Sequence, residues 1–225
     1  MDHHIRAPWR TALGALVLVF AALCVQARHR HLQNEGEAGV FDYYVLSLSW
    51  APTYCLTHTD DGAECSGKGY GFVLHGLWPQ YESGGYPDRC DSQFQMSAEA
   101  ASKGTTIYPS ERLMQHEWQE HGTCSGLDPL NYFLTADRAT AVVKVPKALE
   151  SPPRDQILTP SQIVDFFRGA NHELSGDAMT LACSRGGLSE VRICLTKDLA
   201  PRSCGRGVHT SCPMAPVRLP AASIQ

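Results

Sequence analysis

Residues Gly71–Gln80 read GFVLHGLWPQ, and this stretch carries most of what the sequence predicts about the fold. Its apolar run, bounded by a glycine and a Trp-Pro pair, predicts a strand over Gly71–Leu77. His75 would then project near the end of a strand, a place where sites are commonly built. A histidine beside a strand is more often structural than catalytic, so this segment alone assigns no chemistry.

A second strand is predicted upstream, over Phe41–Trp50. Its side chains alternate between two faces, with Tyr44, Leu46, Leu48 and Trp50 on one and Tyr43, Val45, Ser47 and Ser49 on the other. We expect this strand to be central or nearly central in the sheet. Further along, Met179–Ser184 and Leu188–Thr196 flank the turn Arg185-Gly186-Gly187, which predicts a hairpin.

Three helices are predicted from their start and stop signals. The first covers Ser110–His121 and is stopped by Gly122. Asp128-Pro129 opens the second, and the capping box Thr159–Gln162 opens the third, which reaches Gly169. Strands and helices come in clusters without steady alternation, which favours an α+β fold with a central, mainly antiparallel sheet flanked by helices.

The first 27 residues have the composition of an export signal. Arg6 and Arg10 give a positive front, an apolar run follows over Ala12–Leu23, and Val25–Ala27 provides a small-residue cleavage site. The run is too short to span a bilayer comfortably. Cys24 lies where a lipoprotein signal would place an acylated cysteine, but the bulky Leu23 precedes it, so lipidation is not expected.

The cysteine count and the net charge are taken for the chain that remains after removal of the export signal. Removal of residues 1–27 leaves an even set of eight cysteines, which predicts a disulfide framework in an oxidising compartment. It also leaves 17 basic and 22 acidic residues, a net charge of −5. A broad basic surface that holds duplexes by counterion release is therefore not expected. At the other end, residues 213–225 contain three prolines and no apolar period, which predicts a flexible C-terminal tail.

The second histidine-bearing segment, His116–Cys124, reads HEWQEHGTC. On a helix Glu117 and His121 are four residues apart and share a face. The segment superficially resembles the zinc-peptidase helix, in which two histidines stand four apart. Here the two histidines are five apart, which separates them by about 140° around the helix. Both cannot easily reach one ion, so we predict no metal site.

Together, GFVLHGLWPQ and HEWQEHGTC resemble the two active-site blocks of the ribonuclease T2 family. The resemblance extends to Phe41–Cys55, which is similar to the family's first strand, and to Val191–Leu195, which is similar to its late strand in bacterial members. It covers roughly residues 40–212.

The resemblance implies roles for individual residues. By position, His75 and His121 would be the acid–base pair, because an imidazole pKa near 6.5 leaves either form accessible. The sequence leaves open which is the acid. Glu117 would support His121 and the charged intermediate, and His116 would hold the phosphate. Trp78 would offer a face for base stacking, with a core tryptophan as an equal alternative.

The chain departs from the family pattern at two positions. The family usually has a lysine immediately before the last catalytic histidine, where this chain has Glu120. A carboxylate near the reacting phosphorus should raise the barrier. Gln80 stands where some members carry an aspartate that reads the base, so base preference does not transfer.

The resemblance also implies the disulfide pairing, which spacing alone cannot choose among 105 possibilities. The four expected bonds are Cys55–Cys65, Cys90–Cys124, Cys183–Cys212 and Cys194–Cys204.

The function implied is that of an exported endoribonuclease that needs no metal or cofactor, with residues 28–212 as its catalytic domain. It would cleave single-stranded RNA by internal transfer to a 2′,3′-cyclic phosphate, followed by hydrolysis to a 3′-phosphate. DNA lacks the 2′-hydroxyl nucleophile and would not be cleaved. We expect a monomer, periplasmic or extracellular, without stable membrane association. The rival is a binding or signalling protein that keeps the fold but has weakened catalysis, and Glu120 is its main support.

Overall fold

The computed structural model of the chain describes residues 36–90 and 92–222. The expected export signal, with Cys24, lies outside these residues. Within them, no helix combines the length and the apolar character needed to cross a membrane.

A six-stranded sheet forms the framework of the molecule. Its strands are β1 (Tyr43–Trp50), β2 (Phe72–Gln80), β3 (Gln156–Leu158), β4 (Met179–Ser184), β5 (Gly187–Leu195) and β6 (Val217–Leu219). The order is β2-β1-β5-β6-β3, and β4 also pairs with β5. Every pairing is antiparallel except the short contact between β5 and β6. The predicted α+β fold with a mainly antiparallel sheet is confirmed.

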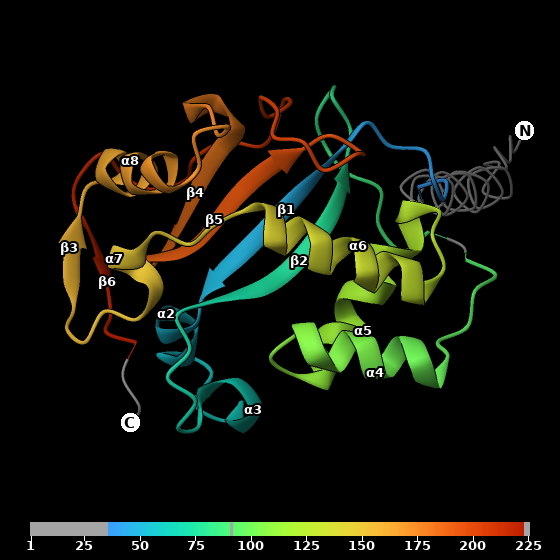
Figure 1. The fold of residues 1–225 in the computed structure, drawn as a ribbon, viewed down its shortest axis with the longest axis horizontal. Coiled ribbons are helices and arrows are strands. Elements are labelled where there is room, and N and C mark those ends of the chain that lie inside the picture. The colour runs from blue at the N-terminus through green and yellow to red at the C-terminus, as the bar shows by residue number, and fades with distance from the viewer. Residues whose placement is uncertain (1–35, 91, 223–225) are drawn as a thin grey trace, which may run out of the picture. The chain divides into compact units, whose positions relative to one another are not determined.

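The main helices pack against one face of this sheet, where their apolar side chains join the core. The helices are α2 (Ala51–Cys55), α3 (Gly62–Cys65), α4 (Ala98–Ile107), α5 (Glu111–Glu120), α6 (Pro129–Val142), α7 (Lys147–Glu150) and α8 (Pro160–Ala170), with 3₁₀ turns at Gly122–Ser125 and Gly176–Ala178. Figure 1 shows α4, α5 and α6 grouped beside β1 and β2, and α8 beside β4. The predicted helix starts are confirmed, because Ser110, Asp128 and Thr159 each accept a hydrogen bond from a backbone N–H of the first turn.

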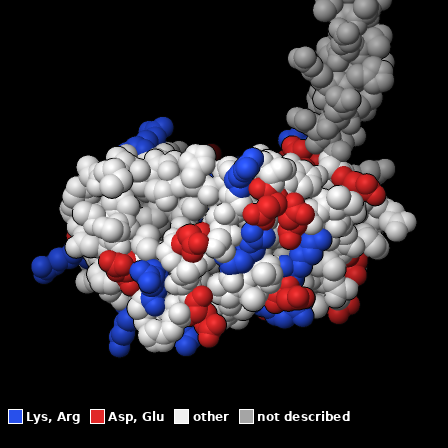
Figure 2. Space-filling view, turned by 90° about the horizontal axis from the view of Figure 1, so that it is seen from above, with Lys and Arg blue, Asp and Glu red and all other residues white. Residues whose placement is uncertain are grey.

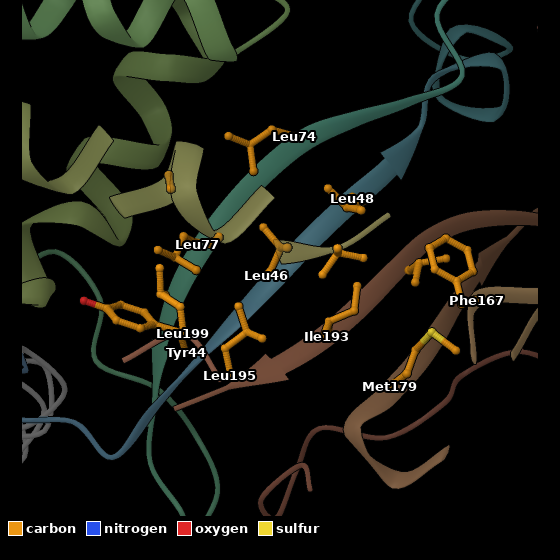
Figure 3. Packing of buried hydrophobic residues seen from close by; sticks show 14 of the residues in the cluster. Tyr44, Leu46, Leu48, Leu74, Leu77, Phe167, Met179, Ile193, Leu195 and Leu199 are labelled. Atoms are coloured by element: carbon orange, nitrogen blue, oxygen red, sulfur yellow. The ribbon is translucent and has the colours of Figure 1, made fainter. Parts of the chain in front are cut away.

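Strand β1 is buried on both faces, as expected for a central strand. On one face Tyr44, Leu46 and Leu48 pack in the main core, where Leu77 of β2 and Ile193 of β5 join them (Figure 3). Truncating a fully buried leucine in such a core typically costs about 2–5 kcal/mol. The opposite face carries a smaller apolar cluster and then two small residues, Ser47 and Ser49, which leave room above the sheet.

Strand β2 differs from its prediction in length and in the position of His75. It continues to Gln80, so His75 lies in its interior and not near its end. Pro79 is tolerated because β2 is an edge strand, which needs no ladder donor on its outer side. Ser47 pairs with Gly76 and Leu48 with Leu74, which leaves His75 as the extra residue of a β-bulge. Such a bulge re-aims a side chain, and this is what exposes His75 to the site.

The predicted flexible tail is wrong for its middle part. Val217–Leu219 forms β6, which pairs with β3, and the side chains of Val217 and Leu219 are buried. Beyond the strand, Trp50 donates its indole N–H to the carbonyl of Pro220. Three residues are too few to show a period in the sequence, so tertiary packing and not local pattern fixes this strand.

Four disulfides tie the loops to this framework. The pairs are Cys55–Cys65, Cys90–Cys124, Cys183–Cys212 and Cys194–Cys204, the same four that the family resemblance implies. Cys90–Cys124 joins the loop after β2 to the turn that follows α5. It therefore ties the loop after β2 to the end of the segment His116–Cys124.

Candidate active site

His75 is held between two carboxylates from different elements. Its Nδ1 lies 3.0 Å from Oε1 of Glu190 on β5, and its Nε2 lies 3.6 Å from Oε1 of Glu117 on α5. Both carboxylates are largely withdrawn from solvent, with side-chain exposures of 14% and 1%. An imidazole between two poorly solvated carboxylates is stabilised in its charged form.

Glu117 is positioned by β2 as much as by its own helix. The indole N–H of Trp78 donates to Oε2 of Glu117 at 2.7 Å. Gly76 makes this approach possible, because a Cβ at that position would collide with both the carboxylate and the indole nitrogen. Glu117 was expected to support His121, but its contacts are with His75 and Trp78. The cause is that α5 ends at Glu120, so His121 leaves the helical face that Glu117 occupies.

His121 has a different environment. It caps the end of α5 with non-helical dihedrals (φ −125°, ψ −44°). Its Nδ1 is buried and has no hydrogen-bond partner among the described residues. Its ring packs against Trp78 and Tyr86, with centroid distances of 5.3 and 5.8 Å. Trp78 also touches His75, at 5.1 Å, so the two histidines approach the same indole.

These environments shift the two histidine pKa values in opposite directions. Burial alone would lower the pKa of His75, but the hydrogen bond to Glu190 and the charges of Glu117 and Glu190 outweigh it, and the net shift is upward. Burial lowers the pKa of His121 to about 4, helped by the charges of His75 and His116. His75 therefore favours the protonated form and His121 the neutral one.

The two carboxylates also differ. Burial raises the pKa of Glu117 to about 7, against the charge of His75 and the hydrogen bond from Trp78. Burial would raise the pKa of Glu190 as well, but the hydrogen bond to His75 and the charges of His75 and Arg192 lower it to about 2. Glu190 is therefore the carboxylate that stays charged beside His75.

Glu120 does not face the site as an isolated negative charge. Both of its carboxylate oxygens accept from Nε of Arg89, at 2.7 and 2.8 Å. The hydrogen bond with Arg89 is the main reason that the pKa of Glu120 is lowered. The expectation that Glu120 acts on the site as an uncompensated anion is therefore corrected, because a cation from the loop before Cys90 is paired with it.

Two cavities open beside this centre, one lined by each histidine. One, of about 510 Å³, is lined by His75, His116 and Glu190 together with Tyr54, Glu64 and Arg112. The other, of about 310 Å³, is lined by Trp78, Gln80, Tyr86, His121, Arg192 and Val208. The structure thus brings the predicted His75, Glu117, Trp78 and His121 into contact and places exposed His116 in the first cavity. The amide of Gln80 in the second cavity donates to the carbonyl of Pro79.

Sequence reasoning missed three charged residues of this site: Arg89, Glu190 and Arg192. Glu190 and Arg192 are two apart on β5, so both project from one face of the strand, and they form an ion pair at 2.6 Å. Arg192 lies within the VRICL segment and Glu190 directly precedes it, so this i, i+2 spacing is a signal that could have directed attention to them. Arg89 lies in a glycine-rich loop and offers no comparable signal.

Comparisons with known proteins agree with this geometry. The model of the ribonuclease T2 family matches residues 41–204. A ribonuclease of Aeromonas hydrophila is 44% identical over 124 residues, which cover 55% of this chain and 53% of that protein. A probable ribonuclease of Haemophilus influenzae is 27% identical over 205 residues, covering 83% and 69%. The match thus spans about half the length of the Aeromonas protein.

Solved structures show the same fold. An RNase-related protein from Calystegia sepium superimposes with a TM-score of 0.64 at 22% identity, covering 80% of this chain and 97% of that one. A variant of RNase MC1 in complex with 5′-UMP gives 0.62 at 21% identity, covering 77% and 96%.

Proposed function

This chain belongs to the ribonuclease T2 family, and on that premise we propose that it is an endoribonuclease that cleaves single-stranded RNA without a metal. One observation carries the proposal: two histidines with opposite pKa shifts approach the same indole, where each can reach a substrate held between the two cavities. Cleaving RNA in this way requires one group that takes a proton and one that gives a proton.

The opposite shifts assign the two roles. His121, neutral, accepts the proton of the 2′-hydroxyl, and it does so through Nε2 because its Nδ1 is buried. The 2′-oxygen attacks phosphorus, the bond to the 5′-oxygen breaks, and His75 donates the proton from its Nε2 to that departing oxygen. The product is a 2′,3′-cyclic phosphate. In the hydrolysis that follows, His75 takes a proton from water, and His121 returns one to the 2′-oxygen to give a 3′-phosphate.

Binding of the substrate phosphate would raise the pKa of His121. A base with a pKa near 4 is weak at neutral pH, but a phosphate anion beside it favours its charged form and raises its pKa. The base thus strengthens when substrate is present. Exposed His116, on the cavity that His75 also lines, adds a second imidazole that can contact the phosphate.

Local cavities, and not a basic surface, would hold the RNA. On the face seen in Figure 2, Lys and Arg side chains are interspersed with Asp and Glu. The two cavities can each take a nucleoside on one side of the scissile phosphate. Trp78, Tyr86 and the guanidinium of Arg192, which lies 5.3 Å from the Trp78 centroid, offer planar surfaces on which a base can stack.

The four disulfides support the further proposal that the protein works in an oxidising compartment, either the periplasm or outside the cell. We also propose that it is a monomer without stable membrane association. The rival function, a binding protein with weakened catalysis, drew its support from Glu120. The pairing of Glu120 with Arg89 removes most of that support.

Digestion of labelled RNA by the purified protein tests the proposal. We expect cleavage in the presence of chelator, products ending in a 2′,3′-cyclic phosphate that convert to 3′-phosphates, and no cleavage of DNA of the same sequence. Intact RNA after prolonged incubation would favour the binding protein. Loss of activity with chelator and its recovery with zinc would instead revive the metal alternative.

A further inference from the structure

His75 is a member of a closed ring of contacts. Its Nδ1 meets Oε1 of Glu190, and Oε2 of Glu190 accepts from Nε and Nη2 of Arg192, at 2.7 and 2.6 Å. The Arg192 guanidinium lies over Trp78, whose indole N–H donates to Glu117, and Glu117 returns to Nε2 of His75. Each oxygen of Glu190 thus has its own partner.

The sheet explains how His75 on β2 reaches Glu190 on β5 with β1 between them. Ser49 of β1 pairs with Glu190, and Ser47 pairs with both Arg192 and Gly76. Directly paired residues project from the same face of a sheet. The two serines are small, so the bulged His75 can cross above β1 to meet the Glu190 carboxylate.

We propose that Glu190, held by Arg192, is a positioning residue that fixes the ring of His75 with Nδ1–H directed at the carboxylate and keeps the ring protonated. Nε2 is then left as the proton donor for the departing 5′-oxygen. This inference rests on the proposed ribonuclease function for its catalytic meaning, but the contact itself does not depend on activity. Glu190 touches neither the substrate nor the reacting atoms, and it acts through His75.

Several other charged groups face His75, and the test has to separate Glu190 from them. Glu117 approaches from α5, and Arg192 lies beyond Glu190 on the same strand. Glu64 of α3 and His121 at the end of α5 interact with His75 through their charges. Glu117 has a pKa near 7, so it is a weaker source of negative charge at neutral pH than Glu190, whose pKa is near 2.

Two substitutions separate orientation from charge. Glu190→Gln keeps an oxygen that accepts from Nδ1–H but removes the negative charge. Glu190→Leu removes both. The exposed Glu173→Gln is the matched control, because it removes one negative charge at a position outside this ring of contacts.

Nitrogen-15 NMR of the imidazole rings in the full chain reads the ring directly. In the wild type, neutral His75 should carry its proton on Nδ1. Glu190→Gln should keep this tautomer and lower the His75 pKa by about one unit or more, the usual effect of losing an adjacent opposite charge. Glu190→Leu should lower the pKa and also lose the tautomer preference. Glu173→Gln should change neither.

The rate profile gives the second reading. Glu190→Gln should move the basic limb of the kcat/KM profile to lower pH by the same amount as it lowers the His75 pKa. Above that limb kcat/KM should fall about tenfold for each pH unit of the shift, and below it the loss should be small. A merely structural Glu190 would lower the rate equally at all pH values. An unchanged His75 pKa and tautomer in both variants would overturn the proposal, whatever the activity. If the NMR shifts occur but the wild type does not cleave RNA, the proposed function fails and the positioning role stands.

Discussion

The two histidines of this site are the same residue type in opposite environments. His75 sits on a β-bulge between two carboxylates, whereas His121 ends a helix with its Nδ1 buried and unpartnered within the described chain. The first environment raises the imidazole pKa and the second lowers it to about 4. Placement on strand or helix end, and not residue identity, thus separates the two imidazole pKa values.

Alanine substitution of either histidine should have the largest effect. We expect His75→Ala and His121→Ala each to lower RNA cleavage by about 10²–10⁴-fold, the usual contribution of a positioned acid or base. A substrate with an acidic aryl alcohol in place of the departing nucleoside distinguishes the two roles. Such a leaving group needs no proton, so His75→Ala should recover most of its rate on this substrate while His121→Ala should not.

The exposed His172→Ala serves as the control for loss of an imidazole, and circular dichroism checks folding. If His121→Ala were the variant rescued by the aryl leaving group, the assignment of acid and base would be reversed. Near-normal turnover of RNA by either variant would remove that histidine from the mechanism.

The second comparison concerns the disulfides beside each histidine. Cys90–Cys124 closes a span of 34 residues next to His121, and Cys55–Cys65 closes a span of 10 on the side of His75. Replacing both cysteines of a pair by alanine should lower the free energy of unfolding by about 2–4 kcal/mol. The loop-entropy model makes the loss about 1 kcal/mol larger for the longer span.

Urea unfolding of the two double variants measures this difference. Equal losses would show that strain or residual structure in the unfolded chain dominates over loop length. We also expect loss of Cys90–Cys124 to lower activity more than loss of Cys55–Cys65, because it releases the segments that carry Arg89 and His121.

The sequence predicts the local parts of this molecule well. Ser110, Asp128 and Thr159 cap the predicted helices because a cap involves only residues two or three positions away. The pattern of β1 predicts a central or nearly central strand, and β1 lies in the interior of the sheet between β2 and β5. The pairing of the eight cysteines, in contrast, comes only from family resemblance.

The sequence does not predict what depends on register. Glu190 is 115 residues from His75, and the contact requires β1 to lie between β2 and β5 with a bulge at one residue. One residue earlier or later, a side chain would project from the other face of the sheet. The contacts of Glu117 differ from the expectation for a related reason. The helix was predicted to include His121, but α5 ends at Glu120.

A third carboxyl on the His75 side gives a smaller, pH-dependent effect. Glu64 is 5% exposed, lacks a partner for Oε1 among the described residues, and burial raises its pKa to about 7. As pH rises from about 4.5 to 7, the unfolded chain releases this proton before the folded one, so Glu64 destabilises the fold increasingly. Glu64→Gln should therefore be more stable than wild type above pH 7, by on the order of 1–3 kcal/mol.

Urea unfolding at pH 5 and pH 8 tests this, with Glu173→Gln as the exposed control. The gain from Glu64→Gln should be largest at pH 8 and should shrink at pH 5. A gain that does not depend on pH would mean that Glu64 has the same pKa in the folded and the unfolded chain.

The smallest expected effect concerns Glu120, whose charge acts on His121, and its partner Arg89. Because the pair is already neutral and Arg89 is 71% exposed, Glu120→Lys should raise kcat/KM only severalfold, up to about tenfold, and added salt should reduce the gain. Arg89→Ala should lower kcat/KM by a similar factor, since it leaves Glu120 uncompensated near His121.

The double variant Arg89→Ala/Glu120→Lys turns these two changes into a cycle. If Arg89 acts by compensating Glu120, Arg89→Ala should cost little once position 120 is a lysine. The double variant should then keep most of the gain of Glu120→Lys, whereas additive single effects would bring it back to about wild-type kcat/KM. Glu120 raises the pKa of His121 through its charge, so Glu120→Lys should also lower that pKa and move the acid limb of the rate profile downward. Purely additive rate effects with an unmoved acid limb would show that the Arg89–Glu120 pair is an exposed ion pair without influence on His121.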